Sequence, residues 1–121
     1  MNIKSEAGHA GEQAAVEYLR SSGALIVERN WRCGRYETAI IALRDDGLCF
    51  VEGKTRSVTC QTTPEEALTA SKRRALLRSA AAYMARHAVR YECRIDLAAV
   101  DLWPDGRCVV RYIENAVECH W

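Results

Sequence analysis

Length, composition and charge exclude several classes of protein. The chain has 121 residues, of which 49% are hydrophobic and 27% charged, so we expect one globular domain over residues 1–121. Its 17 basic and 16 acidic residues give a net charge of +1, so an anionic partner would have to meet a local basic patch. No segment resembles a signal peptide or reaches the roughly 18 apolar residues of a membrane span, which predicts a cytoplasmic protein without membrane contact.

The first half of the chain is predicted to form one helix and three strands. Small and apolar residues recur at helical spacing from Glu6 to Arg20, and Ser21-Ser22-Gly23 should end this helix. The strands are expected over residues 24–31, 36–43 and 48–55, with a turn at 33–35. Asp45-Asp46-Gly47 is a hairpin signal, so the second and third strands should be antiparallel neighbours that bring positions 37 and 39 toward 52 and 54.

The second half is predicted to form one long helix and two strands. Thr63-Pro64-Glu65-Glu66 has the pattern of a capping box with proline at the first helical position, and the helix should run to about His87 and pack against the sheet. A fourth strand is expected over residues 91–100 and a fifth over about 107–113. The expected order is αβββαββ, which places the chain in the α/β class.

The cysteines indicate neither a metal centre nor a disulfide framework. Six are present, and none form a CxxC or CxH pair. A domain of this size builds a core without cross-links, so we expect reduced thiols, with Cys49 and Cys93 inside apolar strands. The final four residues, Glu118-Cys119-His120-Trp121, are assigned no role.

Phe50-Val51-Glu52-Gly53-Lys54 is the most informative stretch of the sequence. Because side chains alternate along a strand, Glu52 and Lys54 should share one face and act on the same ligand. A carboxylate that binds a divalent cation, next to a lysine that positions or deprotonates a water, is suited to metal-assisted phosphodiester cleavage. On the neighbouring strand Glu37 and Ala39 should share a face, and this chemistry would require an acid at position 39.

Several further motifs occur in the order seen in one protein family. They are Gly11-Glu12, Arg29-Asn30-Trp31-Arg32, the segment around Glu37, Phe50 to Arg56, Lys72 and Arg94-Ile95-Asp96. Over about residues 8–101 the chain resembles the YraN-like family of uncharacterised bacterial proteins, which is similar to the PD-(D/E)xK nuclease superfamily. The resemblance implies a restriction-endonuclease-like or tRNA-endonuclease-like fold, related to that of Holliday-junction resolvases, with a mixed sheet flanked by helices.

The resemblance also implies roles for individual residues. Glu52 would be the metal-binding carboxylate and Lys54 the catalytic lysine, with Mg²⁺ or Mn²⁺ as cofactor. The family motif Gly-Glu-Ile-Asp is matched by Tyr36-Glu37-Thr38-Ala39, so the aspartate that would be the principal ligand is absent. This loss should weaken metal binding unless Glu37 reaches the cation from a displaced position. Gly53, where the family has a β-branched residue, should weaken the strand or leave a gap.

Basic residues are concentrated late in the chain. Between residues 72 and 94, seven basic residues oppose only Glu92, a local sum of +6. We expect a surface that binds nucleic acid, DNA rather than RNA. Its expected members are Arg32, Arg35, Arg56, Lys72, Arg73, Arg74 and Arg78. The alternative is that the arginines on the helix only solvate its outer face. Trp31 is expected in the core in preference to stacking on a base.

Other candidate residues have structural explanations beside the functional ones. Glu52 and Lys54 would form a structural ion pair in an arbitrary strand, although the motif favours a functional role. Glu12 is a possible outer ligand for metal or substrate, or an ordinary exposed glutamate. Arg94 and Asp96 share a strand face and should pair with each other. His9 and His87 lack a triad arrangement and are expected to do no chemistry.

Three functions follow from these patterns. The favoured one is a nucleic-acid-binding protein on a nuclease-like fold, with catalysis impaired because Ala39 replaces an acid. The second is an active Mg²⁺- or Mn²⁺-dependent endonuclease that uses Glu37, Glu52 and Lys54. The third is a protein-interaction module that has kept the fold without nucleic-acid contact.

Overall fold

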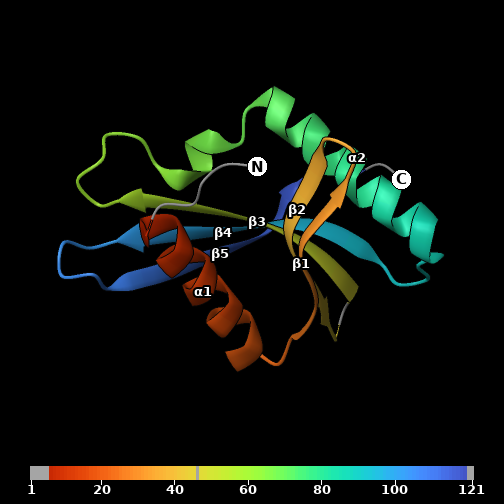
Figure 1. Ribbon diagram of the computed structural model, residues 1–121, viewed down its shortest axis with the longest axis horizontal. Helices are drawn as coiled ribbons and strands as arrows, with labels where there is room; N and C mark the ends of the chain where they lie inside the picture. The colour runs from red at the N-terminus through yellow and green to blue at the C-terminus, as the bar shows by residue number, and fades with distance from the viewer. Residues whose placement is uncertain (1–5, 46, 120–121) are drawn as a thin grey trace.

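Five strands form one mixed sheet in the computed structural model, which describes residues 6–45 and 47–119 (Figure 1). The elements are α1 (Glu6–Ser21), β1 (Leu25–Cys33), β2 (Tyr36–Arg44), β3 (Gly47–Ser57), the 3-10 helix η1 (Pro64–Ala67), α2 (Ala70–His87), β4 (Cys93–Leu102) and β5 (Cys108–Val117). The strands lie in chain order, with β3 and β4 parallel and all other neighbours antiparallel. The predicted α/β class and the order αβββαββ are confirmed, although β5 continues beyond its expected end to Val117.

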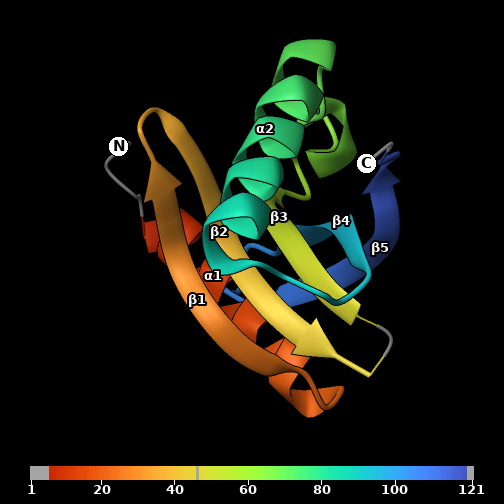
Figure 2. The same ribbon diagram turned by 90° about the vertical axis from the view of Figure 1, so that its right-hand side faces the viewer.

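The two helices cover opposite faces of the sheet (Figure 2). The α1-side cluster contains Ala15, Val16, Leu19, Ile40, Ala42, Cys49, Val51 and Ala98. The α2-side cluster contains Ile41, Leu48, Phe50, Leu76, Ala80, Tyr83, Ile95 and Val117. Consecutive residues of β3 enter alternate clusters, as a strand buried on both faces requires. Glu52 and Lys54 continue the alternation begun by Leu48 and Phe50, so both lie on the face that α2 covers.

The second helix begins later than the sequence pattern predicted. The side chain of Thr63 makes no capping hydrogen bond. The turn that begins at Pro64 is the 3-10 helix η1, and it ends after four residues because Leu68 has a non-helical ψ of 67°. The true N-cap of α2 is Thr69, whose hydroxyl accepts a hydrogen bond of 3.2 Å from the backbone N–H of Lys72. The prediction of a helix starting at Thr63 is therefore wrong, and Lys72 lies in the first turn of α2.

A fork separates β2 from β3 where the candidate site lies. Among the described residues their pairing ends at Ile40 and Val51, and the β1–β2 hairpin then rises away from the other strands (Figure 1). Ala39 and Ile40 both pack against the α1-side cluster, so regular alternation is interrupted at this bend. Beyond it, Thr38 Oγ1 and Ser79 Oγ form a buried hydrogen bond of 2.6 Å that joins β2 to α2. The regular β2–β3 pairing has therefore ended before positions 37 and 39 meet 52 and 54, although Glu37 remains close enough to Glu52 to influence its carboxylate.

The helix α1 meets the sheet at a position without a side chain. Gly11 is buried, and a Cβ placed on it would lie 1.8 Å from Thr55 Oγ1 and 3.0 Å from Thr55 Cβ. Only glycine permits this approach of α1 to β3 without displacement. Gly53, by contrast, has nothing within 4 Å of the place where a Cβ would be, which agrees with the expected gap.

None of the six cysteines forms a disulfide in the described part of the chain. Cys49 is fully buried, and burial raises its pKa to about 12, so it remains protonated at neutral pH. Cys93 lies in β4 as expected and packs against the α2-side cluster, but it is only half-buried. No helix among residues 6–45 and 47–119 is both long and apolar enough to cross a lipid bilayer.

Candidate functional site at the strand fork

Three carboxylates around the fork are each paired with a cation. The pairs are Glu12 with Arg29 at 3.4 Å, Glu37 with Arg32 at 3.2 Å and Glu52 with Lys72 at 3.1 Å. They connect α1 with β1, β1 with β2, and β3 with α2. The Glu12 side chain is 11% exposed, so it is not the exposed helical glutamate that one interpretation assumed. Arg29 was not predicted as a site residue, because only the packing of α1 brings it to Glu12.

Glu52 is a nearly buried acid at the fork. Its side chain is 14% exposed, and burial raises its pKa above the ordinary value of a glutamate. The ammonium groups of Lys72 and Lys54 oppose this rise, whereas the carboxylate of Glu37 adds to it. The direct ion-pair partner is Lys72, and in the described part of the chain no ion pair joins Glu52 to Lys54. The alternative of a structural ion pair within β3 is therefore not found, and Glu52 instead joins the sheet to α2.

The residues at the fork do not fit a divalent metal ion. Position 39 supplies no ligand, and the Ala39 methyl group packs against the α1-side cluster. Glu37 and Glu52 are both held by cations, and among the described residues no group of three or more His, Cys, Asp or Glu side chains is arranged to hold a metal. A divalent cation would have to displace an ammonium or guanidinium group before it gained a carboxylate.

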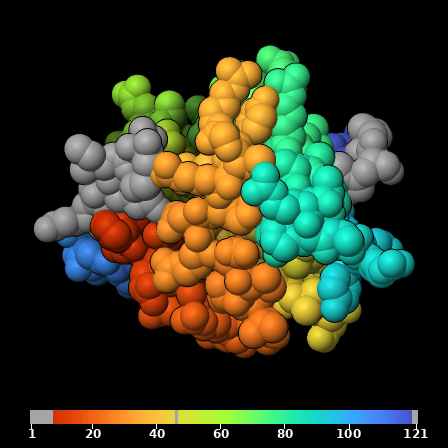
Figure 3. Space-filling model, turned by 45° about the vertical axis from the view of Figure 1, so that its right-hand side comes forward, coloured from red at the N-terminus to blue at the C-terminus, as the bar shows by residue number. Residues whose placement is uncertain are grey.

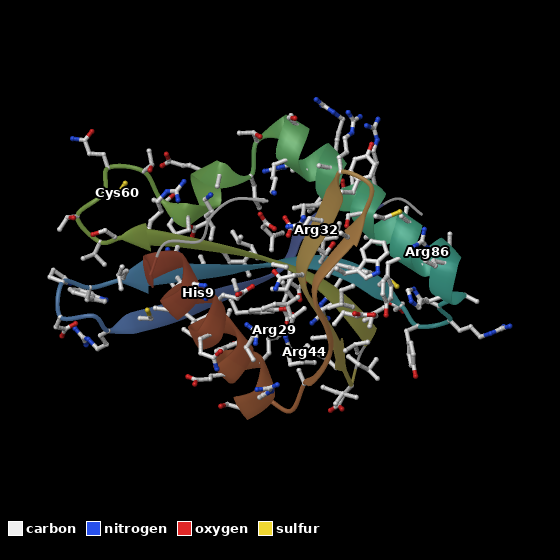
Figure 4. All side chains as sticks on the ribbon, in the orientation of Figure 1. His9, Arg29, Arg32, Arg44, Cys60 and Arg86 are labelled. Atoms are coloured by element: carbon white, nitrogen blue, oxygen red, sulfur yellow. The ribbon has the colours of Figure 1, made fainter. Side chains whose placement is uncertain are left out.

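The tip of the β1–β2 hairpin and the outer face of α2 together present a basic ridge, formed by Arg32, Arg35, Tyr36, Arg78 and Arg86. Figure 3 shows the hairpin lying directly against α2, and Figure 4 shows Arg32 on the hairpin and Arg86 on the helix. Arg78 Nη1 donates to the Tyr36 hydroxyl at 3.5 Å, and Arg35 lies over the Tyr36 ring at 5.5 Å. Arg35 and Arg78 both lower the pKa of the Tyr36 hydroxyl, and Arg35 has the larger effect. Tyr36 and Arg86 were missed as candidates, since the ridge exists only after hairpin and helix pack together.

The other predicted binding residues lie in varied surroundings. Arg56 donates to the Thr55 carbonyl at 3.1 Å, and Arg73 Nε donates to the Leu68 carbonyl at 3.1 Å. Arg74 is exposed on α2. Trp31 packs edge-on against Tyr83 with ring centroids 5.2 Å apart and contacts the α2-side cluster, so the expectation of core packing is confirmed.

Arg94 and Asp96 form the predicted ion pair, within a larger network. The Asp96 carboxylate is completely buried and receives Arg94 Nε at 3.2 Å, the Tyr112 hydroxyl at 2.5 Å and the Asn115 backbone N–H at 3.0 Å. Arg94 also contacts Glu114 at 3.4 Å. With its oxygens bonded to strands β4 and β5, Asp96 is a structural residue and not part of the fork.

A surface cavity of about 710 Å³ lies elsewhere, between the end of α2 and the ends of β4 and β5. Its lining includes Met84, Tyr91, Cys93, Asn115 and Cys119. No carboxylate of the fork and no member of the basic ridge lines it, so this cavity and the candidate site are separate features.

Replacing Glu52 by glutamine tests whether burial dominates at this carboxylate. Because the folded-state pKa is raised, the folded protein holds this proton more tightly than the unfolded chain, and stability falls as the pH rises between the two pKa values. We expect Glu52→Gln to unfold at higher urea concentration than the native chain at about pH 7.5, and to lose most of this advantage at about pH 4.

The exposed Glu66, replaced by glutamine in the same way, provides the control and should show a smaller change between the two pH values. A Glu52→Gln variant less stable than the native protein at the higher pH, with the difference closing on acidification, would mean that the Lys72 pair outweighs burial.

Sequence comparisons place the chain in a known group. A model of the uncharacterised protein family UPF0102 matches residues 11–100. The chain belongs to this family. Relatives in UPF0102 include a protein of Symbiobacterium thermophilum, 46% identical over 110 residues that cover 90% of this chain and 93% of the relative. A UPF0102 protein of Bacteroides thetaiotaomicron is 40% identical over 112 residues, with coverage of 93% and 92%. The expected membership of the YraN-like family is thereby confirmed.

Proposed function

We propose that this UPF0102 member binds nucleic acid, DNA in preference to RNA, without needing a metal ion. The observation that carries the proposal is the basic ridge, in which arginines from the β1–β2 hairpin and from α2 flank an aromatic ring. Positive groups along a surface bind the phosphate backbone, and an aromatic side chain offers a face on which a base stacks. Among the described residues, the ion pair between a ridge arginine and an acid is the one that Arg32 forms with Glu37.

The fork extends this surface toward the sheet. Lys54 and Lys72 carry two positive charges beside the single carboxylate of Glu52, so the immediate surroundings favour an anion such as a backbone phosphate. The N-terminus of α2 adds its own partial positive charge at the same place.

The likeness to PD-(D/E)xK nucleases belongs to this proposal as well. The order αβββαββ and the Glu52–Lys54 spacing on β3 are those that the resemblance implies for a nuclease-like fold. The metal-binding half of such a site is missing, because position 39 is alanine and the nearby carboxylates are paired with cations. We therefore assign the chain binding rather than cleavage, with Mg²⁺ or Mn²⁺ dispensable.

The proposal is tested by measuring binding to labelled single-stranded DNA, duplex DNA and RNA by fluorescence anisotropy in EDTA. The variant Arg35→Gln/Arg78→Gln removes two charges from the ridge, and Arg20→Gln/Arg107→Gln removes two exposed charges elsewhere. Loss of two phosphate contacts should reduce the salt slope of duplex binding by about 2 and weaken binding at least about tenfold at low salt. The matched control should change affinity less than about threefold.

Three outcomes would contradict the proposal. Equal losses in both double variants would mean that general charge, and not the ridge, determines affinity. Absence of binding by the native chain in EDTA and in Mg²⁺ would favour the protein-interaction alternative. Cleavage by the native chain in Mn²⁺ that disappears in Glu52→Ala would establish the endonuclease, in which Glu37 and Glu52 together hold the cation.

A further inference from the structure

Lys72 of α2 forms an ion pair with Glu52, the carboxylate to which the resemblance assigns metal binding. Lys72 Nζ lies 3.1 Å from Glu52 Oε2, and the carboxylate is 14% exposed whereas the lysine side chain is 43% exposed. The lysine thus reaches from the surface onto a nearly buried acid. A carboxylate in such surroundings needs a nearby positive charge to remain ionised, and here α2 supplies it.

The position of Lys72 in α2 is unfavourable for the helix itself. Its backbone N–H is bonded to the N-cap Thr69, so the ammonium lies in the first turn, at the positive end of the helix dipole. The first turn contains no acidic residue. Since capping and dipole effects would favour an acid here, the compensating interaction is the one that Lys72 makes with Glu52.

Among the described side chains, no second carboxylate without a cationic partner lies at this point. Ala39 contributes a methyl group, Glu37 is bound to Arg32 at 3.2 Å, and Glu12 is bound to Arg29 at 3.4 Å. A single fixed ammonium can neutralise Glu52, whereas a divalent cation would bring an excess of positive charge next to Lys54 and the helix N-terminus.

We propose that the Lys72 ammonium has taken the place of the divalent cation at this site, so that Glu52 is held by an internal cation and metal binding is competitively blocked. This inference rests on the proposed function, in which the phosphate of a bound strand lies against Lys54 and Lys72 and no metal bridges it to the protein.

The experiment measures Mn²⁺ binding by calorimetry, and by the electron paramagnetic resonance signal of free Mn²⁺, with no nucleic acid present. Four proteins are compared: the native chain, Ala39→Asp, Ala39→Asp/Lys72→Met and Ala39→Asp/Arg74→Met. Ala39→Asp restores the acid that the resemblance implies as the principal metal ligand, and removing Lys72 from that variant should raise Mn²⁺ affinity at least about tenfold. The Arg74 control removes an equal charge from the same helix and should change affinity less than about threefold.

Glu52→Gln added to the Lys72→Met double variant should abolish the gained Mn²⁺ binding, and thermal unfolding checks that each variant is folded. Equal gains from Lys72→Met and Arg74→Met would overturn the proposal, as would weaker Mn²⁺ binding on removal of Lys72. These readouts involve no nucleic acid, so a failure here is distinct from a failure of the DNA-binding test.

Discussion

Replacing Arg94 by methionine is expected to destabilise the protein by about 3–5 kcal/mol, the cost of leaving a buried carboxylate without its charged partner. Asp96 is completely buried, and Arg94 is its ion-pair partner at 3.2 Å. The remaining donors are the Tyr112 hydroxyl and the Asn115 N–H, which satisfy oxygens without neutralising the charge. Urea unfolding monitored by circular dichroism would measure the loss.

The control for this prediction is a double-mutant cycle with Asp96→Asn. Asparagine keeps the shape of the side chain and removes its charge, so Arg94→Met/Asp96→Asn should be more stable than Arg94→Met alone. If the stability losses of the two single variants simply add, the network stabilises the sheet by packing and hydrogen bonds, and the ion pair makes no separate contribution to stability.

Replacing Gly11 by alanine should also be costly, although alanine is the better helix former. Helix propensity alone predicts a gain of about 1 kcal/mol. The added methyl group would lie 1.8 Å from Thr55 Oγ1, and threonine in a strand has little rotamer freedom with which to move away. We expect a net loss of about 1–3 kcal/mol, typical of overpacking, measured as a lower free energy of unfolding in urea.

Variants at Thr55 distinguish this clash from other effects of the substitution. Thr55→Ala removes the atom nearest to the added methyl group and should recover part of the stability of Gly11→Ala. Thr55→Val keeps the same volume and should recover none. A Gly11→Ala protein more stable than the native chain would show that α1 can move away from β3 at little cost.

The elements of the fold were largely predictable from local patterns. The helical spacing of α1 and the apolar run of β3 depend on neighbouring residues, so their positions could be read from the sequence. The start of α2 was mispredicted because Thr63-Pro64 is a good initiation signal, but Leu68 interrupts the helix after one turn and Thr69 initiates it again. Two competing caps close together cannot be ranked by pattern alone.

The candidate site was predictable in its residues but not in their partners. Glu52 and Lys54 followed from strand alternation, whereas the Glu52–Lys72 pair depends on how α2 crosses the sheet. Arg32 was expected to meet phosphate, and its pairing with Glu37 follows from the register of β1 against β2. Local sequence carries no information on such long-range packing. The divergence of β2 from β3 at Ile40 also depends on long-range packing and could not be predicted.

The parallel pairing of β3 with β4 has a kinetic consequence. Leu48 pairs with Cys93 and Ser57 with Leu102, so every contact of this pair joins residues about 45 positions apart, and α2 lies in the intervening loop. Closing such a loop costs entropy before its contacts are gained, whereas the β2–β3 hairpin can form locally. The hairpin that bears Glu52 should therefore form early during folding, and the carboxylate remains hydrated until α2 arrives with Lys72.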